Sequence, residues 1–107
     1  MVNSVNLVGR VGSNPEVRYF ESGTQKTTFS LAVNRPTSKD DTPDWFNIET
    51  WGKTADVCAN YVRKGGQVGI TGRLQIQSWT DKEGNPRSRP VVVCDRLDLL
   101  GKPNNND

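Results

Sequence analysis

The sequence predicts an all-β domain with a single helix, and two observations support this fold class. Segments in which apolar and polar residues alternate recur along the chain, as half-buried strands require. One stretch, after the third such segment, instead spaces its apolar residues as on one face of a helix. With 107 residues, 33% of them hydrophobic, the chain is long enough for one domain with a small core.

The strands are predicted from this alternation and from the turn residues that separate them. In the first strand, Gly9 is expected at a bend or bulge. Residues 17–20 are interpreted as a short continuation that follows the turn at residues 12–15. The five predicted strands span residues 2–11, 26–34, 44–51, 67 to about 79, and 91–100.

The predicted helix lies between the third and fourth strands. Thr54 is a suitable N-cap, and Asp56 is expected in the first turn, where a negative charge suits the helix dipole. Gly65 follows two basic residues and is expected to end the helix. The apolar stripe is expected to contain Cys58, Tyr61 and Val62. A helix in this position of a five-stranded chain is the arrangement of the OB-fold β-barrel, and it argues against a five-stranded sandwich or an SH3-like barrel.

Three polar segments connect or follow these elements. Residues 35–43 are predicted to form a long mobile loop, and residues 80–90 a long hairpin connection. Residues 101–107 have no means of packing and are predicted to form a disordered polar tail. The folded domain is therefore expected over residues 1–100.

Composition excludes several classes of function. The chain has no histidine, which removes the commonest general base and the commonest metal ligand. Cys58 and Cys94 lack metal-site spacing and are expected as buried thiols, so we expect no cofactor, no metal and no enzymatic activity. The longest apolar run, residues 91–94, is far shorter than the ~20 residues of a membrane span. The protein is therefore expected in the cytoplasm or in an organelle matrix.

The tryptophans fall on outward positions of the predicted barrel. In the third strand, Phe46 and Ile48 share an uncharged face and are expected inside. Trp45 and Trp51 lie on the opposite face, whose other residues are polar or acidic. Trp79 likewise falls on the polar outer face of the fourth strand. The interior is expected to be filled by Phe46, Ile48, Val68, Ile70, Leu74 and Ile76.

Exposed indole rings beside basic side chains indicate binding of unpaired nucleic-acid bases. Each stacked base is worth ~1–3 kcal/mol whatever its identity, and nearby lysines or arginines neutralise phosphates. Lys53, close after Trp51, and Arg73, on the face of Trp79, are the best placed. The two loops are expected to contribute further contacts from Arg35, Lys39, Arg87 and Arg89.

Two alternatives remain open on these residues alone. An RNA-binding or primosome-type OB module would use the same surface. In a protein-interaction module, the tryptophans would instead be buried between subunits. Competition between poly(dT) and poly(U) tests the first alternative, which a preference for RNA would support. Loss of the oligomer on Trp51→Ala would support the second.

Several motifs between residues 5 and 81 are similar to those of one family. They are Val5-Asn6-Leu7-Val8-Gly9-Arg10-Val11-Gly12, Asn14-Pro15-Glu16-Val17-Arg18-Tyr19, Asp44-Trp45-Phe46, Trp51-Gly52-Lys53-Thr54-Ala55, Tyr61-Val62-Arg63-Lys64-Gly65, Gly72-Arg73-Leu74 and Ser78-Trp79-Thr80-Asp81. On these motifs the chain resembles the bacterial type of single-stranded DNA-binding protein. The resemblance implies an OB fold assembled as a homotetramer, with DNA wrapped over its outer surface and bases stacked on Trp45, Trp51 and Trp79.

The resemblance also implies contacts to phosphate and to other proteins. It assigns phosphate contacts to Lys53, Lys64 and Arg18, and it implies a role in replication, recombination and repair with recruitment of proteins of those processes. Together with the residues identified above, the expected phosphate contacts are Arg10, Arg18, Arg35, Lys53, Lys64, Arg73 and Arg87.

The chain departs from the family pattern in three places. Residues 34–42 offer no further stacking aromatic, and the positions before Trp79 hold Gln75, Gln77 and Ser78 where basic residues are usual. Binding along that strand is therefore expected to be weaker or less sensitive to salt. The family's acidic and hydrophobic tip is also absent after residues 104–107, which leaves open whether it was removed or this member lacks it.

Overall fold

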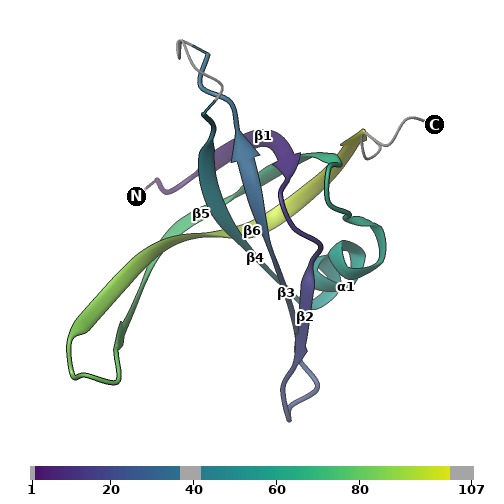
Figure 1. The fold of residues 1–107 in the computed structure, drawn as a ribbon. Coiled ribbons are helices and arrows are strands. Elements are labelled where there is room, and N and C mark those ends of the chain that lie inside the picture. The colour runs from purple at the N-terminus through teal and green to yellow at the C-terminus, as the bar shows by residue number, and fades with distance from the viewer. Residues whose placement is uncertain (1, 37–41, 102–107) are drawn as a thin grey trace.

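The computed structural model of the chain describes residues 2–36 and 42–101. In these residues it contains six strands and one helix (Figure 1). Lys39 and most of the predicted loop, and all of the predicted tail except Gly101, lie outside the described residues. The elements are β1 (Val5–Val11), β2 (Glu16–Tyr19), β3 (Gln25–Val33), β4 (Asp44–Trp51), α1 (Gly52–Tyr61), β5 (Gln67–Thr80) and β6 (Pro86–Gly101).

The six strands form one sheet that closes into a barrel. Their order is β1-β5-β6-β4-β3-β2, and an additional pairing of β1 with β3 completes the ring. All pairings are antiparallel except that of β4 with β6, where Ile48 lies opposite Val92. The helix follows the third predicted strand as expected; counting the short β2 separately makes its neighbours β4 and β5.

The interior of the barrel holds the core. Ile48, Val68 and Ile70 are buried as predicted, and Phe46 packs against the core from a partly buried position. The helix lies against the barrel next to β3 and β4 (Figure 1). There the buried hydroxyl of Thr27 donates a hydrogen bond to the carbonyl oxygen of Ala55, at 2.9 Å.

The prediction that Leu74 and Ile76 fill the interior is wrong. Their side chains are 44% and 59% exposed. They lie where β5 pairs only with β6, Leu74 opposite Val92 and Ile76 opposite Pro90, and this pair projects from the barrel as a two-stranded ribbon (Figure 1). Because no further strand covers the ribbon, alternation there does not lead to burial.

The connection at the end of the ribbon is shorter than predicted. β5 continues to Thr80 and β6 begins at Pro86, so the turn spans residues 81–85, with Gly84 at a φ of 86°. Arg87 and Arg89 therefore lie on a strand and not in a loop.

Two glycines are required where strands approach closely. A Cβ on Gly72 would collide with the carbonyl oxygen of Val93, and one on Gly9 with that of Ala32. The register of β5 and β6 shifts between Thr71 and Gly72, so a bulge or irregularity of the ladder lies at this close approach. Gly9 lies next to Arg10, where β1 changes its partner from β5 to β3.

The helix begins earlier than predicted, at Gly52, whose φ of 60° suits glycine. Thr54 is therefore inside the helix and not its N-cap, and Asp56 lies beyond the first turn. Tyr61 does not belong to the buried stripe, since it is 66% exposed. The position of the helix is set by the preceding strand, which leads directly into it, and by the burial of Ala55 and Cys58.

Candidate nucleic-acid interface

The outer faces of β3 and β4 form the floor of a surface groove. Cross-strand pairs place Lys26 opposite Trp51 and Ala32 opposite Trp45. The strand rise separates the two tryptophans by about 20 Å along β4. Trp45 and Trp51 are 59% and 40% exposed, which confirms that they point outward. The floor between them is lined by Lys26, Thr28, Ser30, Asn47 and Glu49.

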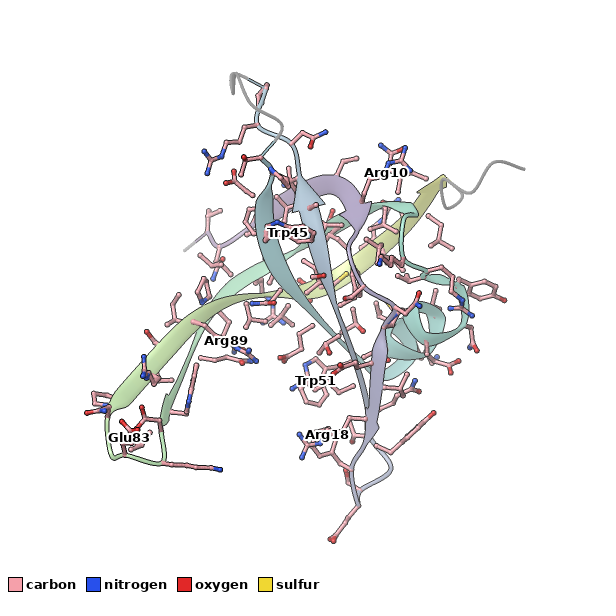
Figure 2. All side chains as sticks on the ribbon, in the orientation of Figure 1. Arg10, Arg18, Trp45, Trp51, Glu83 and Arg89 are labelled. Carbon is pink, nitrogen blue, oxygen red and sulfur yellow. The ribbon has the colours of Figure 1, made fainter. Side chains whose placement is uncertain are left out.

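The groove has a volume of about 540 Å³ and is bounded by β2 on one side and β6 on the other. Glu16 and Arg18 contribute from β2, and Arg89 and Val91 from β6. Figure 2 shows Arg89 and Trp51 pointing toward one another from the ribbon and the barrel, with Arg18 on the side of Trp51. Arginine side chains therefore face the groove from opposite walls.

Trp79 lies on the ribbon beside the groove and is 46% exposed. It pairs with Arg87 across the ribbon, while the next outward position, Gln77, pairs with Arg89. The guanidinium carbon of Arg89 is 5.8 Å from the centre of the Trp79 ring, within range of a cation–π contact. This face of the ribbon thus alternates an aromatic ring with cations.

Trp51 belongs to a cluster of rings and cations that the sequence did not reveal. Its ring stacks on Phe20 with centroids 5.7 Å apart and planes inclined by 22°. The ammonium of Lys26 is 5.4 Å from the centre of the Trp51 ring, and the guanidinium of Arg18 is 5.1 Å from that of Phe20. Lys26 and Thr28 are two residues apart and lie on the same, outward face of β3. This alternation was the sequence pattern from which the position of Lys26 could have been predicted.

Glu49 is buried, although it occupies an outward position of β4. Its Oε1 accepts a hydrogen bond from Nε1 of Trp51 at 2.8 Å, and its Oε2 accepts one from Nε2 of Gln77 at 2.9 Å. Lys26 Nζ lies 3.5 Å from the same Oε2. The carboxylate therefore connects β3, β4 and the ribbon beneath the groove.

Trp45 packs over a glycine. A Cβ built on Gly12 would collide with the Trp45 ring and approach the hydroxyl of Ser30. The Ser30 hydroxyl is also 3.1 Å from that of Ser13. The absence of a side chain at Gly12 thus leaves the space that the Trp45 ring occupies on the outer face of the barrel.

Three of the predicted phosphate contacts are ion-paired. Arg35 binds Asp44 at 2.8 Å, Arg73 binds Asp95 at 3.3 Å, and Arg87 binds Asp81 at 3.0 Å. The hydrogen bond with Asp44, together with its charge, raises the pKa of Arg35. The backbone N–H of Asn85, followed by the Arg87 guanidinium, lowers the pKa of Asp81.

The other predicted phosphate contacts are spread over the surface. Arg18 lines the groove, and Lys53 is exposed at the start of α1, two residues after Trp51. Arg10 donates a hydrogen bond to the carbonyl oxygen of Gly65 at 3.0 Å, which places it near Lys64. Figure 2 shows Arg10 away from the groove, so the structure does not gather all seven residues at one site.

The described residues contain no group of three or more side chains able to hold a metal ion. None of the helices in the described part is long and apolar enough to cross a membrane. Cys58 and Cys94 are buried free thiols, as predicted. Burial, followed by the nearby charge of Cys58, raises the pKa of Cys94 to about 12.

Comparison with known proteins identifies the family. Residues 2–100 match the model of the single-strand binding protein family. Single-stranded DNA-binding protein 1 of a Synechocystis species is 55% identical over 107 residues, which cover 98% of this chain and 88% of the relative. The single-stranded DNA-binding protein of Thermosynechococcus vestitus is 56% identical, with 99% of this chain and 88% of the relative covered.

A solved structure supports the same assignment. It is described as the Plasmodium falciparum SSB complex with ssDNA, and it superposes with a TM-score of 0.84 at 26% sequence identity, covering 94% of this chain and 96% of that one. The similarity confirms the predicted OB fold. The matching family is one of DNA-binding proteins and not of enzymes. With nearly its whole length matched, the chain belongs to the single-strand binding protein family.

Proposed function

We propose that this protein binds single-stranded DNA without sequence preference, by stacking bases on Trp45, Trp51 and Trp79 and by neutralising phosphates with basic side chains. The observation that carries the proposal is the groove itself. Exposed tryptophans flank its floor, and Arg18 and Arg89 face it from opposite walls. The names of the two relatives described above agree with this function.

The chemistry of the groove favours unpaired strands. Every base has a π face, so an exposed indole accepts any base, and each stack contributes ~1–3 kcal/mol. Bases within a duplex are already stacked and cannot lie on an indole. The described groove residues offer hydroxyl, amide, ammonium, carboxylate and guanidinium groups. Stacking on indoles does not discriminate between bases, which is consistent with tolerance of sequence.

The phosphate contacts fall into two groups. Arg18, Lys53, Lys64 and Arg10 are not ion-paired to a carboxylate in the described structure and would neutralise phosphate directly. Arg35 and Arg73 would first have to leave exposed carboxylates, and Arg87 the partly buried carboxylate of Asp81. Exposed ion pairs are worth about 0–1 kcal/mol, so a phosphate can replace the carboxylate, but with a smaller net gain.

We further propose a homotetramer in which residues 1–100 form the DNA-binding domain. Apolar side chains remain exposed on the outer face of the barrel at Val8, Leu99 and Leu100. Residues 5–8 of β1 pair with β5 on one edge only, and an unpaired edge can add a strand from another copy.

Binding of single strands suits a role in replication, recombination and repair. The partners would be proteins of those processes, and the protein would act in the cytoplasm at the nucleoid.

Tryptophan fluorescence tests this function. Titration with oligothymidylates of increasing length at low salt is expected to quench the emission, with reversal by added salt. Unchanged emission would exclude stacking on the tryptophans. Competition with poly(U) tests the RNA-binding alternative, which a preference for RNA would support, and light scattering measures the oligomer.

A further inference from the structure

Glu49 is a buried acid beneath a groove that we propose binds a polyanion. Its side chain is 6% exposed, and that of Lys26 is 22% exposed. A buried carboxylate is costly unless it is paired and hydrogen-bonded. Here both oxygens have partners: Nε1 of Trp51 on one, and Nε2 of Gln77 with Nζ of Lys26 on the other.

The three partners of Glu49 are themselves parts of the interface. Trp51 is a stacking ring, Lys26 lines the floor of the groove, and Gln77 belongs to the ribbon that carries Trp79 and Arg89. Removing Glu49 would leave the indole N–H and the Gln77 amide without this acceptor. The carboxylate thus determines how the edge of the Trp51 ring and the ribbon sit relative to each other.

The pairing also affects the charge of the groove. Lys26 is the lysine on the groove floor, but its ammonium is 3.5 Å from Glu49 and 5.4 Å from the centre of the Trp51 ring. Its charge is already balanced inside the protein. A phosphate could recruit Lys26 only by leaving the buried carboxylate unpaired, which costs more than breaking an exposed pair.

We infer that Glu49 is a positioning residue that aligns Trp51 and the ribbon and withholds Lys26 from phosphate, so that this part of the groove binds by stacking and not by charge. The inference deepens the proposed function and rests on it. It assigns opposite roles to two lysines close to Trp51: Lys53 neutralises phosphate, and Lys26 does not.

The salt dependence of binding tests this assignment. Affinity for an oligothymidylate of about eight nucleotides, within the site size of one OB fold, is measured as a function of salt for the wild type, Lys26→Gln, Glu49→Gln and the double variant. Lys26→Gln is expected to leave the slope of log affinity against log salt unchanged. Glu49→Gln releases Lys26 and is expected to steepen that slope by about 0.7, the value for one phosphate on a single strand.

The double variant is expected to return to the slope of the wild type. Between 50 and 200 mM salt, Glu49→Gln alone should therefore lose about 2.6-fold more affinity than the wild type does. Lys53→Gln is the matched lysine control and is expected to flatten the slope by about 0.7. The amide retains one acceptor oxygen and the shape of the side chain, and thermal unfolding checks that each variant is folded.

A flatter slope for Lys26→Gln would overturn the inference, because it would show Lys26 on phosphate in the wild type. Equal slopes for folded Glu49→Gln and the wild type would overturn it as well. If Glu49→Gln does not fold, the salt slope of Lys26→Gln alone still shows whether Lys26 contacts phosphate in the wild type. A wild type that fails to bind at low salt would instead overturn the proposed function, and this inference with it.

Discussion

The ring of Trp51 stacks on that of Phe20, with centroids 5.7 Å apart and an interplanar angle of 22°. Trp51 ends β4, and Phe20 directly follows β2, so two separate strands hold one aromatic pair. Trp51 is nevertheless 40% exposed. A ring that is already packed on a neighbour loses little conformational freedom when a base stacks on it, which favours binding.

Phe20→Ala is therefore expected to weaken binding without removing any direct stacking residue. An aromatic pair contributes about 0.5–1.5 kcal/mol beyond its burial, which corresponds to about 2- to 12-fold in affinity if that support is lost. Trp51→Ala should cost more, about 1–3 kcal/mol. Fluorescence titration with an oligothymidylate measures both.

Tyr19→Ala is the control for Phe20→Ala. Tyr19 precedes Phe20 and is 69% exposed, and it does not line the described groove. Its removal should leave the affinity unchanged. A Phe20→Ala variant that binds as the wild type does would show that Trp51 needs no support from β2.

Arg89 is expected to contribute more to DNA binding than Arg73. Arg89 lines the groove and lies 5.8 Å from the centre of the Trp79 ring, whereas Arg73 is ion-paired with Asp95 at 3.3 Å and does not line it. Arg89→Gln should flatten the salt slope by about 0.7. Arg73→Gln should change it by much less; a larger effect of Arg73 would place the DNA path elsewhere.

Strand parity predicted the outward tryptophans correctly, because alternation is a local property of any strand. It failed for Leu74 and Ile76, since parity states which face a residue occupies and not what covers that face. Both lie beyond Gly72, where the pairing of β5 with β1 ends and β5 continues paired only with β6. The last strand was predicted to begin at residue 91, but β6 begins at Pro86. The prolines and turn residues before residue 91 are typical of a loop, so the sequence did not indicate this part of the strand.

The supporting residues of the interface could not be predicted for a different reason. Phe20, Lys26 and Glu49 gain their roles from pairings between strands, which depend on the register of β2 with β3 and of β3 with β4. Strand parity placed Glu49 on the outward face of β4, the face of Trp45 and Trp51. Its contacts with Trp51, Gln77 and Lys26 explain its burial.

Gly12→Ala is expected to weaken DNA binding through Trp45. The new Cβ would collide with the outer edge of the indole, so the ring must move and the stacking surface is displaced. Affinity should fall by up to the ~1–3 kcal/mol of one stacked base, with little effect on thermal stability, because Trp45 is exposed and can rotate away.

Gly101→Ala provides a comparison for Gly12→Ala. A Cβ at Gly101 would meet its nearest neighbours, two side-chain atoms of Gln67, at 3.6 Å, which is an ordinary van der Waals contact. Binding should be unchanged in this variant. If both variants bind as the wild type does, the orientation of Trp45 is not required for affinity.

Cys94 is expected to make the stability of the protein depend on pH at alkaline values. Burial, and then the charge of Cys58, raises the pKa of the folded thiol from 9.0 to about 12. Below pH 9 the thiol is neutral in both the folded and the unfolded chain. Above it the unfolded chain releases the proton while the folded protein retains it, so stability is lost as pH rises toward 12.

Cys94→Ala removes this dependence but also loses buried contacts, so it should be less stable than the wild type at pH 8. The difference in unfolding free energy between the two is expected to narrow above pH 9, by up to about 1.4 kcal/mol per pH unit. Urea unfolding at matched protein concentration, at pH 8, 9.5 and 10.5, measures the difference directly. Groups that are not coupled to Cys94 titrate equally in both proteins and cancel in the difference. A difference that stays constant over this range would show that the Cys94 thiol ionises as easily in the folded barrel as in the unfolded chain.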